Sequence, residues 1–152
     1  MGLLVENGGN RPELNKTPAH TMKFWIGAEI DKSAYEAFRL ARKEVEKTLN
    51  EKLADKSYDL ALDSFDCISV MRGDAVFGER FLYSPKRRNM DFRIWMDLGE
   101  FIAADPLTQQ TQIFEMLLRA ADVLKTKKGI SSEAVDELKS DLMNVGHEMH
   151  WR

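Results

Sequence analysis

The sequence predicts an α+β fold, a four-stranded, mostly antiparallel sheet with three helices in the order β-α-β-β-β-α-α. Three observations lead to this prediction. Four segments have the alternation or the apolar content of strands, and three longer segments repeat apolar residues at helical spacing. The length of 152 residues suits a single hydrophobic core. A half-buried sheet and amphipathic helices cover each other's apolar faces, so this is the economical arrangement of the seven elements.

The clearest strand spans 90–98, where apolar and polar residues alternate strictly. The apolar set comprises Met90, Phe92, Ile94, Met96 and Leu98. The other set comprises Asp91, Arg93, Trp95 and Asp97. Because successive side chains of a strand point to opposite faces, the apolar set, including Phe92 and Ile94, is predicted to form a wall of the core. The other face is an acidic ladder interrupted by one arginine and one tryptophan.

Three more segments are predicted strands. Residues 23–30 alternate, and residues 65–72 are largely apolar on both faces, which indicates a central strand covered on both sides. Residues 76–84 form the next strand and complete a three-stranded meander with 65–72 and 90–98. Residues 1–21 are predicted to be a flexible arm or a leader left from cloning, because Gly, Asn and Pro break any periodicity there. The domain is therefore predicted to span 22–152.

The first predicted helix starts at a cap formed by Asp31 or Ser33 and runs to about Leu53. Ser33 and Glu36 have the spacing of a capping box, in which each side chain satisfies a backbone N–H at the helix start. The apolar residues keep helical spacing on one stripe. This stripe consists of Ala34, Phe38, Ala41, Val45, Leu49 and Leu53.

Two further helices are predicted in the C-terminal third. One opens at Asp105-Pro106, where Asp105 can cap it and proline suits the first helical position. It ends at Gly129, after lysines that favour the negative end of the helix dipole. The other starts at Ser131 or Ser132. The lysines at the end of the first of these two helices are Lys125, Lys127 and Lys128. The apolar stripe of the last helix consists of Val135, Leu138, Leu142, Val145 and Met149.

Composition narrows the classes of function. The net charge is −3 and the isoelectric point is near 5.7, whereas proteins that bind duplex nucleic acid usually carry a basic surplus. The single cysteine, Cys67, is expected to be a buried small hydrophobe, which fits a reducing compartment. No apolar run reaches the roughly 18 residues that span a bilayer, and Gly2–Val5 is too short for a signal-peptide core. We therefore expect a cytoplasmic protein without a membrane or direct nucleic-acid partner.

Two candidate sites are weak. His147 and His150 are three residues apart and could share a metal ion on a helix. Glu148 is nearby, but no third histidine accompanies them. Gly146 is expected to end the helix before them, so a surface tail is favoured and no metal or other cofactor is predicted. The loop Lys86-Arg87-Arg88 is either a solvated hairpin loop or a contact for a phosphate or an acidic partner.

Carboxylates and tryptophans near the strands leave further alternatives open. Paired carboxylates can catalyse proton transfer. However, the chain lacks a nucleophile elbow, a P-loop and a dinucleotide-binding glycine pattern, so no catalytic residue is predicted. Trp25 and Trp95 are either covered by a helix layer or part of a binding surface, where Trp95 beside Arg93 would be an interface anchor. The carboxylates considered are Glu29, Asp63, Asp66, Asp91 and Asp97.

Three stretches together resemble small immunity proteins of bacterial polymorphic-toxin and contact-dependent growth-inhibition systems. They are Lys23–Ile30, the segment Phe65–Asp97 with Asp91-Phe-Arg-Ile-Trp95, and Leu117–Asp122. The resemblance covers about residues 22–150. It implies a cytoplasmic, non-enzymatic protein that binds and neutralises one cognate toxin domain, often a nuclease.

The charge distribution is compatible with this implication. Between Ser57 and Asp105 there are nine acidic and six basic residues, and an acidic inhibitor would complement a basic nuclease surface. A small regulatory or ligand-binding module that uses the Trp25/Trp95 face is the alternative, with a carboxylate-dependent enzyme as the weaker one. The predicted partner-binding residues are Asp74, Glu79, Lys86, Arg87, Arg88, Asp91, Arg93, Trp95 and Asp97.

Overall fold

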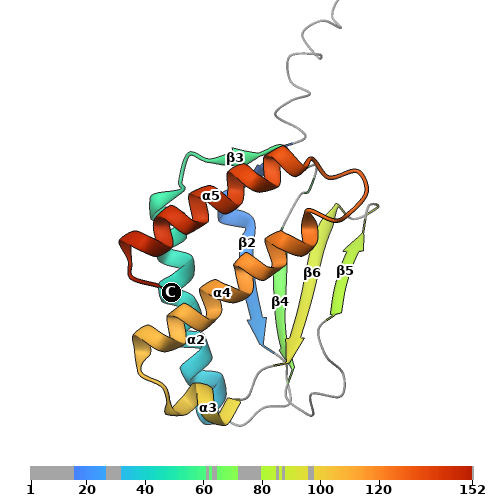
Figure 1. Cartoon of the computed structure of the whole chain (residues 1–152). Helices are drawn as coiled ribbons and strands as arrows, with labels where there is room; N and C mark the ends of the chain where they lie inside the picture. Colours follow the sequence, from blue (N-terminus) through green and yellow to red (C-terminus); the bar gives the residue numbers. More distant parts are fainter. Residues whose placement is uncertain are drawn as a thin grey trace, which may run out of the picture.

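The structure is a computed structural model that describes residues 16–26, 32–60, 62, 65–71, 80–84, 86, 88–95 and 98–151. Within these residues the helices lie together in front of a sheet (Figure 1). They are α2 (Lys32–Lys52), α3 (Leu98–Ala103), α4 (Pro106–Leu124) and α5 (Ser132–Glu148), with the short 3-10 helix η1 (Ala19–Thr21). The strands are β1 (Thr17–Pro18), β2 (Met22–Ile26), β3 (Ser57–Tyr58), β4 (Phe65–Met71), β5 (Arg80–Ser84) and β6 (Asn89–Trp95).

The main sheet has the strand order β2-β4-β6-β5. Strand β4 pairs in parallel with β2 on one side and with β6 on the other, and β5 pairs antiparallel with β6. Helix α2 therefore lies in the connection between two neighbouring parallel strands, as such a pair requires a crossover. In the register, Val70 of β4 is opposite Ile94 of β6, and Leu82 of β5 is opposite Asp91.

The predicted fold, a mostly antiparallel four-stranded sheet with three helices, is wrong. Two of the three pairings in the main sheet are parallel, and a second, two-stranded sheet pairs β1 with β3. The described residues form four α-helices, and more of them are helical than extended. The error came from joining three consecutive strands as a meander. Consecutive strands are often neighbours, but here β6 pairs with β4 and displaces β5 to the edge.

The long helices agree closely with the sequence prediction. The stripe of α2 is buried from Ala34 to Leu49. Asp105 caps α4, because its carboxylate accepts a hydrogen bond of 2.7 Å from the backbone N–H of Thr108. This bond holds the pKa of Asp105 below its usual range. Ser131 caps α5 through the N–H of Ala134 at 3.2 Å.

Three details of the predicted helices differ from the structure. Helix α4 ends at Leu124, five residues before the predicted end at Gly129. Helix α2 begins at Lys32, so Ser33 is its second residue and not its N-cap. Glu36 instead forms an ion pair with Arg39 at 2.6 Å. Helix α5 continues through Gly146 to Glu148, because a glycine inside a helix weakens it by only about 1 kcal/mol and packing can compensate.

Helix α3 was not predicted, because its first residue, Leu98, closes the alternating pattern of the strand predicted over 90–98. In the structure the strand β6 ends at Trp95 and Leu98 begins the helix. This helix has no periodic apolar pattern in the sequence, and its contacts with α2 and α4 stabilise it. Phe101 is fully buried, and its ring lies 5.9 Å from that of Phe38 on α2. The side-chain amide of Gln109 donates a hydrogen bond of 2.9 Å to the carbonyl of Phe101, which ties α3 to the start of α4.

Residues 17–21 pack on the domain, although the predicted arm included them. The hydroxyl of Thr17 donates to the carbonyl of Leu62 at 2.6 Å and accepts from its N–H at 3.1 Å. Thr17 and Ala19 are buried, and β1 pairs with β3. This part of the predicted arm therefore belongs to the packed structure, and residues 1–15 lie outside the described residues.

Helices α2, α4 and α5 form a layer around one cluster of buried side chains. Helix α4 contacts both α2 and α5, and it also contacts strands β4, β5 and β6. The cluster extends from Ala19 to Trp151. Phe92 and Ile94 are described here only by their backbone in β6, so their burial stays a prediction. None of the described helices has the length and apolar character needed to cross a membrane.

Candidate partner-binding surface

The predicted partner-binding residues concentrate on β6 and on the turn before it. Asp91, Arg93 and Trp95 are residues of β6, for which the structure describes the backbone. Lys86 and Arg88 belong to the turn that joins β5 to β6. The remaining predicted residues lie outside the described part of the chain: Asp74, Glu79, Arg87 and Asp97.

The turn between β5 and β6 presents basic side chains. Lys86 is exposed, and Arg88 is partly exposed with a φ of 54°, in the left-handed region that non-glycine residues rarely adopt outside turns. Arg88 also takes part in an interaction within the chain. The antiparallel pairing of Ser84 with Asn89 closes the hairpin below this turn.

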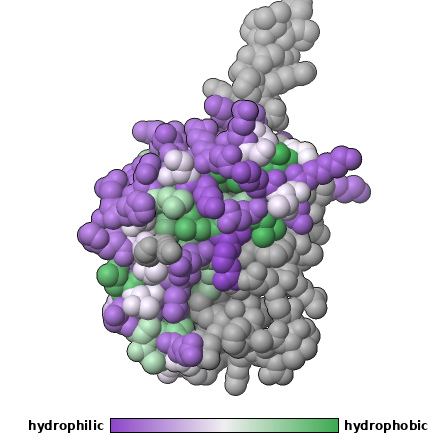
Figure 2. Space-filling model, in the orientation of Figure 1, coloured by the Kyte–Doolittle hydropathy of each residue, from purple (hydrophilic) through white to green (hydrophobic). Residues whose placement is uncertain are grey.

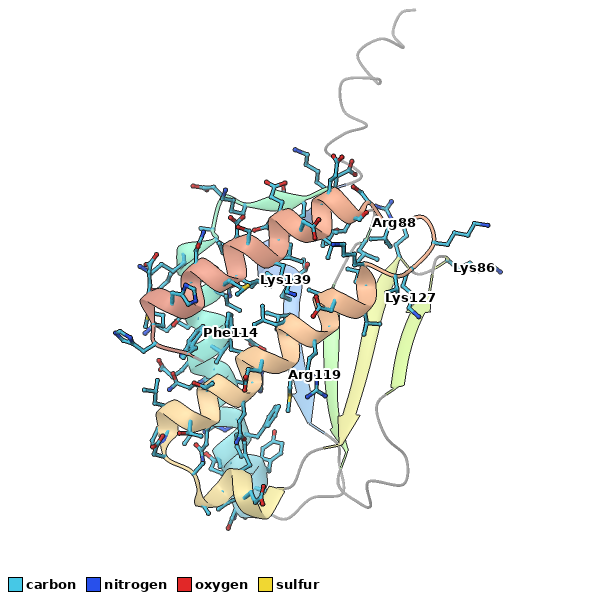
Figure 3. The ribbon with its side chains drawn as sticks, viewed as in Figure 1. Lys86, Arg88, Phe114, Arg119, Lys127 and Lys139 are labelled. Atoms are coloured by element: carbon cyan, nitrogen blue, oxygen red, sulfur yellow. The ribbon has the colours of Figure 1, made fainter. Side chains whose placement is uncertain are left out.

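The loop between α4 and α5 brings more lysines to the same end of the molecule. Figure 3 shows Lys127 at the end of α4, near the turn that carries Lys86 and Arg88. This proximity agrees with the contacts of α4 with both β5 and β6. Lys128 is exposed, and Gly129 has a φ of 88° that suits glycine where the chain reverses. The sequence pattern explains these lysines by the helix dipole, and it contains no signal that they lie near the β5–β6 turn.

One cation lies further along α4. Figure 3 shows Arg119 on the part of α4 that crosses the sheet. Partial burial lowers the pKa of the Arg119 guanidinium, which still remains charged at neutral pH. Arg119 already has an interaction within the chain. Although Arg119 is exposed, this interaction within the chain is the reason why we do not count it with the partner surface.

The opposite charge gathers where α5 begins beside β3. A shallow pocket of about 250 Å³ is lined there by three carboxylates and one lysine. Further along α5, Asp141 accepts a hydrogen bond of 2.8 Å from the hydroxyl of Tyr58. Burial, together with this bond, raises the pKa of Tyr58. The pocket is lined by Lys16, Ser57, Asp59, Ser131, Glu133, Ala134 and Glu137.

The two C-terminal histidines have a structural explanation. His150 has a φ of 61° and follows the end of α5. Its N–H bonds to the carbonyl of His147, and the N–H of Trp151 bonds to the carbonyl of Gly146 at 2.8 Å. These are the two bonds of a Schellman motif, which ends a helix and turns the next residue back onto it. Within the described residues, no group of three or more metal-ligating side chains converges.

Exposed apolar residues do not form a large patch on the α4–α5 side. Figure 2 shows mostly hydrophilic residues there, with hydrophobic residues in small separate areas. Exposed large apolar side chains occur on four different helices. They are Tyr35, Leu40, Ile102, Leu107 and Met143. Scattered exposed apolar residues of this kind are normal on a protein surface.

Comparison with known proteins identifies the family. The chain matches the family model described as immunity protein 44 over residues 22–148. The chain belongs to this family. The resemblance to immunity proteins of toxin systems is thus confirmed. No curated protein and no solved structure matches the chain.

Membership of the immunity protein 44 family bears on each candidate feature. An immunity protein has a toxin as its partner in general, which favours a protein-binding surface over a catalytic centre. The matched region begins at Met22, the first residue of β2, and ends at Glu148, the last residue of α5. It therefore includes both basic loops and the acidic pocket residues, which are Asp59 directly after β3 and Glu133 and Glu137 on α5.

Proposed function

We propose that this member of the immunity protein 44 family binds a cognate bacterial toxin domain and neutralises it by occupying its surface, without turnover. The match of residues 22–148 to the immunity protein 44 family carries this proposal. We further propose that the protein acts in the cytoplasm, within a polymorphic-toxin or contact-dependent growth-inhibition system. A nuclease is the toxin class that the acidic balance of the chain favours, since nucleases present basic surfaces to their substrates.

We place the partner surface on β6 and the adjoining β5–β6 turn. The alternation of residues in a strand puts Asp91, Arg93 and Trp95 on one face and Phe92 and Ile94 on the other. Helix α4 lies against β6 on one side of the sheet. If the apolar residues face α4, the charged face of β6 is directed away from the helix layer, with Lys86 at its edge.

The test of this function is co-expression with the toxin domain encoded beside the gene of this chain. We expect the wild-type chain to restore growth and to co-purify with the toxin domain. Failure of the folded wild-type chain to do either would contradict the proposed function for that toxin. Turnover of a substrate by the purified chain alone would support the enzyme alternative instead.

The position of the surface is tested separately by the double variant Asp91→Lys and Asp97→Lys. Exposed charges contribute little to folding but can contribute strongly to a complementary interface. We therefore expect weaker protection with an almost unchanged melting temperature. Full protection by the folded double variant would remove these two residues from the interface.

A further inference from the structure

We propose that Lys86 and Arg88, together with Lys127 and Lys128, form a basic docking surface for an acidic epitope of the cognate toxin domain. We call these four residues the loop end. This inference rests on the proposed function, because it assigns the chemistry of one part of the toxin surface. It extends the predicted surface to the α4–α5 loop, about 40 residues further along the chain.

The fold brings these two loops together. Strand β5 runs toward its turn with β6, and α4 runs across β4, β6 and β5, which it contacts. In Figure 1 the end of α4 and the β5–β6 turn lie at the same edge of the molecule, and Figure 3 places Lys86, Arg88 and Lys127 there. Neither loop contains an acidic residue from 85 to 89 or from 125 to 130.

Folding alone does not account for these lysines. Lysines near a helix C-terminus interact favourably with its dipole, but this effect is limited to the last turn. Lys125 directly follows α4 and also pairs with Asp136 at 2.7 Å, so it serves that role. Lys127 and Lys128 lie beyond this position, and no ion pair joins them or Lys86 to another described residue.

Charge separation within the molecule favours a protein epitope as the occupant. The net charge of −3 would repel a nucleic acid from most of the surface. The start of α5 carries Glu133, Asp136 and Glu137, so the basic area ends within one turn of that helix. A small area of this kind fits an acidic patch on a folded domain better than a continuous phosphate backbone. Its complementary charge would accelerate association and orient the partner.

The test compares two double variants with the same change in charge. Lys127→Glu with Lys128→Glu reverses the charge of two of the four loop-end residues. Lys43→Glu with Lys47→Glu reverses the charge of two exposed lysines on α2. The probe is the toxin domain encoded beside the gene, inactivated by an active-site substitution. Association rates are measured by stopped flow or surface plasmon resonance at low and high salt. Circular dichroism checks the fold of each variant.

We expect the loop-end variant to associate about tenfold more slowly at low salt and the α2 variant to change by less than about threefold. The difference should shrink as salt screens the charges. Adding Lys86→Glu to the loop-end variant should slow association further. If the loop-end variant is misfolded, Lys127→Gln with Lys128→Gln replaces it, with a smaller decrease expected.

Each other outcome has a definite meaning. Equal association rates for both folded double variants would overturn the inference and leave the proposed function intact. No binding by the wild-type chain would contradict the proposed function itself. A 20-base-pair DNA duplex is measured in parallel as a second probe. Binding of this duplex by the wild-type chain, lost in the loop-end variant while toxin binding is unchanged, would overturn the inference in favour of nucleic acid.

Discussion

Helices α4 and α5 form an antiparallel pair whose two ends differ in chemistry. One end, where α4 begins and α5 finishes, is closed by Trp151. Its indole N–H donates to the side-chain oxygen of Gln110 at 3.1 Å, and its ring lies 5.1 Å from that of Phe114. Trp151 and Phe114 are each about 1% exposed. These two rings have therefore lost nearly all contact with water.

The other end of the same pair is open and charged. The loop from Lys125 to Ile130 joins the helices there. Lys125 and Lys128 are exposed, and Lys127 is half-buried. Apart from Lys125, whose partner Asp136 is itself on the surface, they add little to the core. The difference indicates a division of roles. The closed end holds the helix pair together through buried contacts, whereas Lys127 and Lys128 of the loop belong to the surface that we propose meets the partner.

The largest effect is expected at the closed end, from Phe114→Ala. Removing the buried ring leaves a cavity between α4 and α5 and takes away the face on which Trp151 packs. We expect a loss of about 3–5 kcal/mol in the free energy of unfolding. Urea denaturation followed by tryptophan fluorescence measures it. A loss below about 1 kcal/mol would mean that the closed end does not hold the helix pair.

The next effect concerns Gly146, where α5 lies against the ring of Phe114 on α4. A Cβ added there would lie 2.5 Å from Cε2 of Phe114, so the ring or the helix must move. Overpacking of this kind costs about 1–3 kcal/mol, while alanine gains about 0.5–1 kcal/mol over glycine inside a helix. We therefore expect Gly146→Ala to destabilise the chain by about 1 kcal/mol, and by no more than about 2.5 kcal/mol.

A second variant isolates the contact with the ring. In a background that carries Phe114→Leu, the shorter side chain leaves room for the new methyl group. Gly146→Ala should then be neutral or stabilising in denaturant unfolding. An unchanged penalty in that background would show that Phe114 is not the obstacle.

A smaller effect is expected from Gln110→Ala, which removes the acceptor of the Trp151 indole. The bond is partly buried, and a hydrogen bond of this type contributes about 0.5–1.5 kcal/mol net. We expect a loss in that range, measured by thermal and urea unfolding. Gln110→Glu serves as the control, because it keeps an acceptor oxygen and should retain most of the stability at neutral pH.

The helix pair also shows how far the sequence could predict this fold. The helical repeat and the caps at Asp105 and Ser131 were enough to locate α4 and α5, because both signals are local. The neighbours of each strand were not predictable in the same way. The alternation in β6 indicates which residues share a face, but it does not show that β6 pairs with β4 rather than following a meander.

The closed end and the loop end were missed for a related reason. The return of Trp151 onto the helix cannot be read from the sequence, because a Schellman motif usually places glycine where His150 stands. The lysines after α4 were visible, as was Lys86, but nothing local indicates that a helix end and a hairpin turn share one edge of the molecule. Contacts between segments that are distant in the chain bring this helix end and this turn together, and no single sequence motif predicts such contacts.

The smallest effect on folding is expected at the lysines of the α4–α5 loop. These variants test most directly whether the two ends of the helix pair have different roles. Lys127→Glu with Lys128→Glu should change the free energy of unfolding by no more than about 0.5 kcal/mol, because substitutions at surface positions that make no specific contact fall in this range. Urea unfolding at low and high salt measures it, with Lys125→Glu as the contrast. Lys125 has Asp136 as a partner and lies at the helix end, so its reversal should cost more at low salt than at high salt. A loss above about 1 kcal/mol for the Lys127/Lys128 pair would show that these lysines hold the loop in place, and the two ends of the helix pair would then differ in polarity but not in role.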